Sequence, residues 1–383
     1  MKRQIGLDAL RGLFLALMTL THLPTSASRW ASQPFGFLSN AEGFVFLSAF
    51  LVGSIYASRA QMAPLQTAAT LWRRAGKLYV YHLITLVFAF TFAAWIAVAY
   101  ERPALQHLLG YYLSQPDTAI GEALWLLYRP PLLDILPLYI VFLLASPMLL
   151  ASRSRGGWGL LLGASAVLWL LAQIGLRGWM HDATTLVAGL RVPPLRQSGA
   201  FDLFAWQFLW VGGLFVGAWS ARNPAWPKRI PTGLMWTALL AALTLLLLRY
   251  SLGMTPAGWR WAVNKWHLAP LRVLEVTAIT LIVARCGGTV ARSLPLAPLA
   301  FLGRSSLPVF TAHVITCLLF LGLIRDDSVA LAPATQLAII IVSFAVLYSV
   351  AAWDQAWDRG WRPWSGSRLS LLFRRGSVDH SAA

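Results

Sequence analysis

Charged side chains are scarce in this sequence, at 12% of its 383 residues, whereas hydrophobic residues make up 58%. A water-soluble domain of this composition would have too little polar surface to cover its core. The apolar segments recur at lengths of roughly 17 to 25 residues, which is what a bilayer core of about 30 Å requires of a helix. The chain is therefore predicted to be an all-α, polytopic transmembrane bundle.

Cysteine is almost absent. Only Cys286 and Cys317 occur, within or at the edge of apolar segments, where they are interpreted as small hydrophobic side chains. This pair indicates neither a disulfide nor redox chemistry, and no metal site is predicted.

Acidic residues are also few, at 14 against 31 lysines and arginines, which gives a net charge of +17. Nucleic-acid binding would need these cations on one face of a folded domain. They lie between the apolar segments instead, so no nucleic-acid partner is predicted. With ten spans and a cytoplasmic N-terminus, 19 basic residues fall on the cytoplasmic side and 10 on the opposite side. This bias predicts that both termini are cytoplasmic.

Ten membrane spans are predicted, at 5–23, 43–58, 78–100, 132–150, 158–176, 203–219, 232–248, 268–284, 305–324 and 335–352. Residues 1–352 are expected to form one membrane domain and residues 353–383 a basic cytoplasmic tail. The segment 101–131 is mixed in polarity and is expected to form a re-entrant or interfacial helix on the outer face. Asp8 and Arg11 interrupt the first apolar run, and no small-residue cleavage site follows it, so it is interpreted as a retained helix rather than a signal peptide.

Arg11 and His22, in the first span, are separated by ten residues. Eleven steps of about 100° bring the second side chain to within about 20° of the first, and about 16 Å further along the helix. Ionisable groups within spans tend to face a cavity, a partner or a substrate, because each costs roughly 2.5 to 3.5 kcal/mol on insertion. The two residues are therefore predicted to line a passage that lets a donor and an acceptor meet from opposite sides.

This helix resembles the acyltransferase 3 superfamily, in which an arginine, ten residues and a histidine follow a motif similar to Leu7-Asp8-Ala9-Leu10. The chain also resembles the OpgC branch, the osmoregulated periplasmic glucan succinyltransferases. The blocks that carry this resemblance are MTLTHLP at 18–24, AEGFVFLS at 41–48, DILPLY at 134–139, AWQ at 205–207 and GRSSLPVF at 303–310, followed by His313. The usual Ser-Gly of the second helix is Ser48-Ala49 here, a departure that bears on close helix packing.

The resemblance implies acyl transfer from cytoplasmic acyl-CoA, which is succinyl-CoA in the OpgC branch, to a carbohydrate hydroxyl outside. It implies a multi-pass protein of the bacterial inner membrane with no permanently bound cofactor. The expected partners are acyl-CoA, a periplasmic glucan or other glycan, and membrane lipid.

Four residues near the first two spans are then given roles. His22 is predicted to be the general base on the acceptor hydroxyl, or else a helix-end histidine bonded to a carbonyl. Glu42 either orients that imidazole or is an acid favoured at a helix N-terminus. Arg11 is predicted to bind a phosphate or the pantetheine carbonyl of the donor, with Asp8 beside it in the donor site. The alternative is an ion pair between Asp8 and Arg11.

Three candidates lie in the eighth and ninth spans. His313 is predicted to line the donor channel, or to be a packed histidine bonded to a neighbouring helix. Arg272 and Glu275 are three residues apart and are expected to pair with each other, although Arg272 would also suit a dicarboxylic acyl group.

Asp134, Tyr139 and Gln207 are further candidates for lining the substrate path. Tyr139 and Gln207 would equally serve as hydrogen-bonding groups between helices.

Two other classes of function are compatible with ten polar-lined helices. A transporter or flippase of a glycan or lipid-linked sugar would need paired halves with interrupted helices in matching positions, and the sequence has no such duplication. A purely structural protein would not explain the ionisable groups within spans. The acyltransferase is the favoured interpretation.

Overall fold

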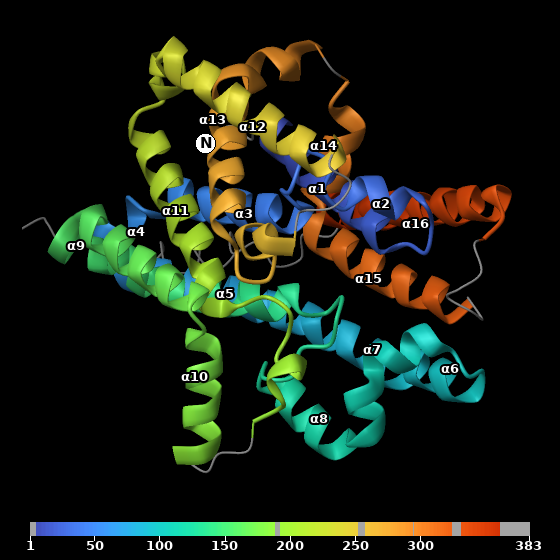
Figure 1. Cartoon of the computed structure of the whole chain (residues 1–383). Coiled ribbons are helices and arrows are strands. Elements are labelled where there is room, and N and C mark those ends of the chain that lie inside the picture. Colours follow the sequence, from blue (N-terminus) through green and yellow to red (C-terminus); the bar gives the residue numbers. More distant parts are fainter. Residues whose placement is uncertain (1–4, 188–191, 252–256, 294, 324–330, 361–383) are drawn as a thin grey trace, which may run out of the picture.

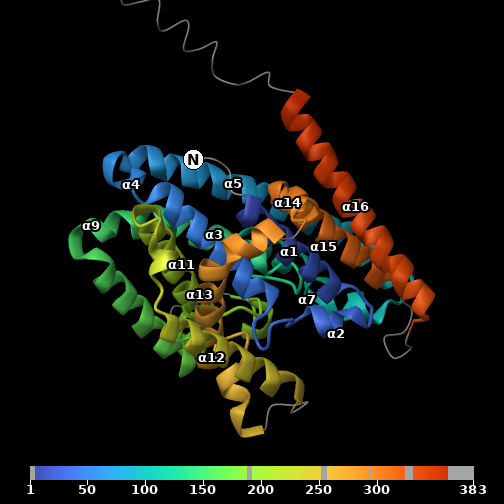
Figure 2. The ribbon, with the colours of Figure 1, turned by 90° about the horizontal axis from the view of Figure 1, so that it is seen from above.

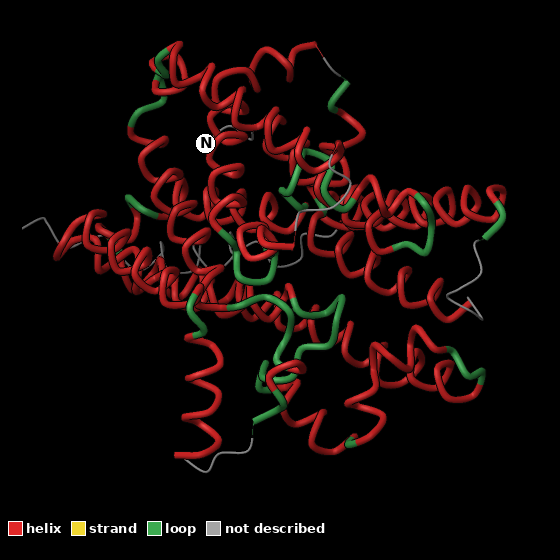
Figure 3. Tube along the Cα trace, viewed as in Figure 1, coloured by secondary structure: helices red, strands yellow, loops and turns green. Residues whose placement is uncertain are grey.

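The computed structural model describes residues 5–187, 192–251, 257–293, 295–323 and 331–360, and every regular element within these ranges is a helix (Figure 3). The α-helices are α1 (Ile5–His22), α2 (Ala27–Ala31), α3 (Asn40–Tyr56), α4 (Arg59–Met62), α5 (Pro64–Phe88), α6 (Ala94–Ala99), α7 (Pro103–Ser114), α8 (Pro116–Leu124), α9 (Ile135–Gln173), α10 (Leu176–Asp182), α11 (Leu203–Arg222), α12 (Thr232–Ser251), α13 (Pro270–Ser293), α14 (Ala297–Arg304), α15 (Ser306–Leu323) and α16 (Pro333–Gly360). Two π-helices, Ala89–Ala93 and Ala183–Val187, and three short 3-10 helices, Leu195–Gln197, Trp226–Arg229 and Ala257–Val263, complete the set.

Eight helical segments of the described residues are long and apolar enough to cross a membrane. A ninth candidate is a bent pair of helices, Gly157–Gln173 and Leu176–Leu186, which meet at an angle of 77° and together are long and apolar enough to form one span. The remaining predicted span, 43–58, corresponds to α3, which is apolar but only 17 residues long. The prediction of an all-α polytopic bundle is therefore confirmed, and the protein is a multi-pass membrane protein.

The fourth and fifth predicted spans are joined in one bent helix, α9. The bend lies at Gly157, whose φ of 69° and ψ of −176° interrupt the helical backbone. A positive φ of this size favours glycine, which has no Cβ. The chain thus turns without a loop between these two spans.

The segment 101–131 contains two helices, α7 and α8, rather than the one expected. Each has a proline in its first turn, where the missing N–H would have no partner within the helix. The two helices lie together to one side of the bundle (Figure 1).

The centre of the molecule depends on close contact between α3 and α11. A Cβ at Gly217 would lie 2.0 Å from the carbonyl oxygen of Phe50, and one at Gly213 would lie 2.6 Å from the Cβ of Ala49. Small residues let helix backbones approach closely in membranes. Ala49, which replaces the glycine usual in the resembled superfamily, is fully buried and is accommodated because Gly213 has no side chain opposite it.

A second close contact joins α1 to α14. A Cβ at Gly12 would lie 1.8 Å from the carbonyl oxygen of Leu299, and one at Gly303 would lie 1.8 Å from that of Asp8. Figure 2 shows α1 beside α14 and α15. This contact brings the first half of α1 next to the end of α14 and the start of α15.

The last helix, α16, runs along one edge of the molecule (Figure 2) and continues to Gly360. The expected boundary at 352/353 falls inside it, so residues 353–360 extend the last helix. The rest of the expected tail lies outside the described residues.

Candidate active site

Among the cavities beside α1, two are lined by ionisable side chains. The first, here called the basic cavity, has a volume of about 290 Å³ and includes Arg11 in its lining. The second, here called the histidine cavity, has a volume of about 190 Å³ and includes His22. Because ten residues of helix separate Arg11 from His22, the cavities lie toward opposite ends of α1.

Cations dominate the basic cavity. Besides Arg11 it is lined by Arg74 and Lys77 from α5 and by Arg304 at the end of α14. Its described carboxylates are Asp354 and Asp358 of α16, and its neutral polar groups are Ser48, Tyr139, Ser305 and Ser306. Such a concentration of positive charge favours an anionic ligand.

Asp8 lies behind this cavity rather than in its lining. Its side chain is buried, and one carboxylate oxygen is 3.9 Å from the Nε of Arg304. Asp8 therefore helps to fix the cation at the end of α14.

His22 lies against His313 of α15. The Nδ1 of His22 is 3.2 Å from the Nε2 of His313, and the two rings stack with their centroids 5.3 Å apart. The Nδ1 of His313 is 3.4 Å from the Sγ of Cys317. His313 is not among the residues that line either cavity, so it supports His22 from behind, as a histidine bonded to a neighbouring helix.

This contact defines what His22 can do chemically. If Nδ1 of His22 donates its hydrogen to His313, then Nε2 of His22 keeps its lone pair and can accept a proton. His313 in turn donates from its own Nδ1 to the sulfur of Cys317. The arrangement resembles other sites in which one ring nitrogen is held so that the other is available for proton transfer.

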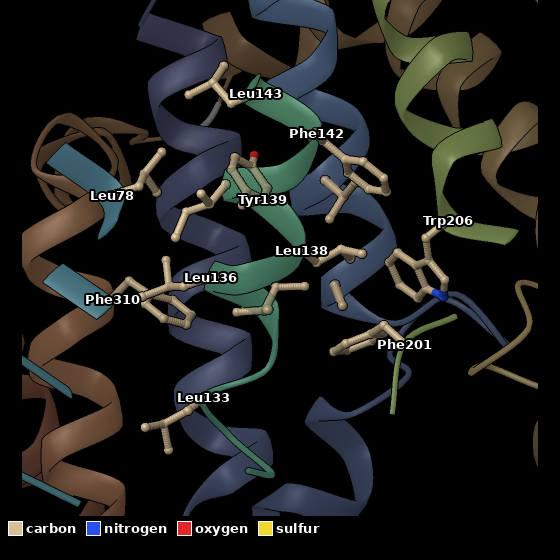
Figure 4. Close-up of a cluster of buried hydrophobic side chains, with 14 of the residues drawn as sticks. Leu78, Leu133, Leu136, Leu138, Tyr139, Phe142, Leu143, Phe201, Trp206 and Phe310 are labelled. Carbon is tan, nitrogen blue, oxygen red and sulfur yellow. The ribbon is translucent and has the colours of Figure 1, made fainter. Parts of the chain in front are cut away.

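Phe310 and Ile135 line both cavities and therefore lie between them. Phe310 is 4% exposed and extends from α15 toward Leu136 in the first turn of α9 (Figure 4). The described structure thus differs from the single passage expected from the sequence, because an aromatic ring separates its two halves.

Glu42 and Arg272 form a buried ion pair at 2.6 Å. Glu42 also accepts hydrogen bonds from the backbone and the hydroxyl of Ser39, which caps α3, as expected of a capping box. Among the described residues, Glu42 bonds to Ser39, as the helix-terminal interpretation expects, and to Arg272, but not to His22.

The expected pairing of Arg272 with Glu275 is replaced by other contacts. Arg272 also donates to the carbonyl oxygens of Phe37 and Val263, and Glu275 accepts from the backbone N–H of Phe37 at 2.9 Å. Neither residue lines the two cavities. Their sequence spacing favoured an i, i+3 pair, but Phe37, in the loop before α3, bonds to both residues, and Glu42 of α3 forms the ion pair with Arg272.

Asp134 lies at the start of α9 and lines the histidine cavity. Its carboxylate accepts a hydrogen bond from the backbone N–H of Ala200 at 3.2 Å. Burial raises the pKa of Asp134 to about 6, although the Ala200 hydrogen bond and the charge of Lys265 oppose this change. The carboxyl group therefore changes its charge in a range close to neutral pH.

The last two candidates are hydrogen-bonded between helices. The hydroxyl of Tyr139 donates to the carbonyl oxygen of Phe44 at 3.2 Å, and Tyr139 also lines the basic cavity. Gln207 accepts from the hydroxyl of Ser165 at 2.6 Å and donates to the Ser165 carbonyl at 2.9 Å. Gln207 is in neither cavity lining.

Several lining residues were not predicted as site residues. Arg74 and Lys77 are three residues apart on α5, and this spacing, which puts them on one helix face, was a usable signal. Lys265 lies in an irregular segment, where no periodicity indicates its direction. Asn40, whose Nδ2 donates to Thr21 and to the carbonyl of Ala31, lies in a short loop-to-helix transition.

A family model described as OpgC protein matches residues 3–359 of the chain. A search of curated proteins found no match, and a search of solved structures found none either. The match covers α1 to α16 and so includes both cavities.

Proposed function

The chain belongs to the OpgC protein family, and we propose that it is a membrane-bound O-acyltransferase that moves an acyl group from cytoplasmic acyl-CoA to a hydroxyl of a periplasmic glucan or other glycan. Family membership itself suggests a glucan-modifying acyltransferase. The donor, the direction of transfer, the inner-membrane location and the cytoplasmic termini belong to the proposal, as does the wider kinship with the acyltransferase 3 superfamily.

The observation that carries the proposal is the pair of cavities at opposite ends of α1. Acyl-CoA is polyanionic because of its phosphates, and the basic cavity offers it Arg11, Arg74, Lys77 and Arg304. The charge bias assigns the segments that carry Arg74, Lys77 and Arg304 to the cytoplasmic side. The histidine cavity, toward the other end, offers a base to an acceptor that arrives from outside.

The proposed chemistry is acyl transfer assisted by a general base. Nε2 of His22 takes the proton of the acceptor hydroxyl as its oxygen attacks the thioester carbonyl carbon. The carbon–sulfur bond then breaks, and the leaving thiolate takes the proton from the imidazolium. The products are an ester and free CoA thiol, and His22 returns to its starting state. His313 acts as a positioning residue, because it fixes the tautomer of His22 through Nδ1.

The test uses the purified protein in liposomes, with labelled acyl-CoA on one side and candidate glucans on the other, followed by mass analysis of the glucans. Substitution His22→Ala is expected to lower transfer by roughly 10²- to 10⁴-fold, the usual contribution of a general base. The exposed His107 of α7 provides the matched control, His107→Ala, which should keep wild-type activity.

Near-normal transfer by the His22→Ala protein would contradict the role of His22 as base. Passage of unmodified glucan across the bilayer, with intact acyl-CoA for every donor tried, would favour the transporter instead.

A further inference from the structure

Lys265 is a cation without a counter-ion in the histidine cavity. Among the residues that the structure describes, its ammonium group has no hydrogen-bond or ion-pair partner. Its Nζ lies over two aromatic rings, 5.0 Å from the ring centroid of Trp266 and 5.6 Å from that of Phe201. Such cation–π contacts hold an ammonium group without neutralising its charge.

The segment that carries Lys265 is fixed by buried partners. The carbonyl oxygen of Trp266 accepts hydrogen bonds from the backbone N–H of Asp202 at 3.0 Å and from the indole of Trp206 at 3.1 Å. Gln173 donates to the carbonyl of His267 at 2.7 Å. A long, flexible lysine therefore starts from a rigid base, which is what a binding residue needs.

The other charged groups near the cavity do not pair with Lys265. Arg272 and Glu42 neutralise each other, and Asp134 accepts from the backbone of Ala200. Burial lowers the pKa of Lys265, whereas the charges of Glu42 and Asp134 raise it. An unpaired charge in a partly enclosed site is costly unless a ligand compensates it.

We propose that Lys265 binds a carboxylate of a substrate in the histidine cavity, at the far end of the transferred acyl group. This inference rests on the proposed function. The acyl carbonyl must come beside His22 for the transfer, so the carbons beyond it lie in the same cavity, which Lys265 also lines. Arg272, the cation that the sequence suggested for this purpose, is already paired with Glu42.

The experiment compares succinyl-CoA with butyryl-CoA, which have four-carbon acyl groups that differ by a carboxylate in place of a methyl group. The full-length protein in liposomes receives each donor with a neutral glucan, and kcat/KM is measured for both. The wild type is expected to prefer succinyl-CoA by roughly 10- to 100-fold, the usual range for a hydrogen bond to a charged group. Lys265→Met should abolish the preference, and Lys265→Arg should keep most of it.

The exposed Lys228 provides the matched control, and Lys228→Met should leave the preference unchanged. A second arm repeats the assay with an acidic glucan and a neutral donor. If Lys265→Met loses the preference for the acidic glucan and keeps the donor preference, Lys265 binds an anion of the acceptor, and its assignment to the acyl group is overturned. If Lys265→Met changes neither preference while remaining folded and active, the inference is overturned. Absence of transfer by the wild type with every donor would instead overturn the proposed function.

Discussion

Arg73 and Arg74 are neighbours on α5, but only Arg74 lines the basic cavity. Arg73 is exposed and bonds to the carbonyl oxygen of Ala69 in its own helix. If the basic cavity binds the phosphates of acyl-CoA, Arg74→Gln should raise the KM for acyl-CoA roughly tenfold or more, because hydrogen bonds between charged groups are among the stronger ones. Arg73→Gln should leave KM unchanged. Equal effects of the two substitutions on steady-state kinetics would remove the basis for the donor site.

Asp134 makes stability depend on pH. Its folded-state pKa of about 6 is raised above the value near 4 expected in an unfolded chain. A raised pKa means that the folded state holds the proton more tightly than the unfolded state does. Protonation of Asp134 therefore stabilises the fold, and this stabilisation is fully present below about pH 4 and is lost as pH rises through about 6. The contribution of Asp134 to the free energy of unfolding therefore differs by on the order of 3 kcal/mol between pH 4 and pH 7.

The check is thermal unfolding in detergent between pH 4 and 7. The substitution Asp134→Asn keeps an acceptor for the N–H of Ala200 but cannot ionise, so it should raise the melting temperature at pH 7 and flatten the profile between pH 4 and 6. An unchanged profile would show that Asp134 is not the group responsible.

The sequence identified some of these residues and not their partners. The spacing of Arg11 and His22 follows from helix geometry alone, and each lines a different cavity. The contacts of His22 with His313 and of Glu42 with Arg272 join positions 291 and 230 residues apart. Such pairs are set by how the helices pack, which local spacing does not encode.

At the scale of elements, the contact between α3 and α11 can be tested with two glycines of α11, Gly212 and Gly217. A Cβ at Gly217 would meet the backbone of Phe50, which cannot move without shifting α3. Gly217→Ala should therefore destabilise the protein by roughly 1 to 3 kcal/mol or prevent folding, as overpacking does. At Gly212 a Cβ would meet nothing within 4 Å, so Gly212→Ala should be tolerated. Melting temperature and yield after membrane extraction measure the difference, and equal behaviour of the two variants would show that this contact is not tight.

Helices were the most predictable feature, because their apolar lengths follow from the bilayer thickness. The bends within the helices were less predictable from the sequence. The predicted spans 132–150 and 158–176 flank the turn of α9, but the sequence did not indicate that this turn would be a bend at Gly157 within one helix rather than a loop. The division of 101–131 into α7 and α8 was signalled by Pro103 and Pro116, since proline is favoured in the first turn of a helix.

At the scale of the whole molecule, the side chains of Phe310 and Ile135 separate the basic cavity from the histidine cavity. Four of the helices that build the two cavities, α1, α5, α9 and α15, are distributed along the chain, so no stretch of sequence specifies either cavity. A thioester that enters from the basic cavity must pass this barrier to reach His22. Phe310 therefore acts as a gate under the proposed function, and it also keeps water from the donor.

Removal of the Phe310 ring should uncouple cleavage of the thioester from transfer of the acyl group to the glucan. With Phe310→Ala, water from the histidine cavity can reach the thioester with His22 as its base, so hydrolysis of acyl-CoA in the absence of glucan should rise severalfold while the yield of acylated glucan per CoA released falls. Phe92, which is 43% exposed and lines a groove away from both cavities, provides the control. Phe92→Ala should keep the wild-type ratio of acylated glucan to CoA released. The measurement is CoA thiol release with and without glucan in sealed liposomes. A Phe310→Ala protein that remains folded and keeps the wild-type ratio would show that the two cavities are separated by something other than this ring.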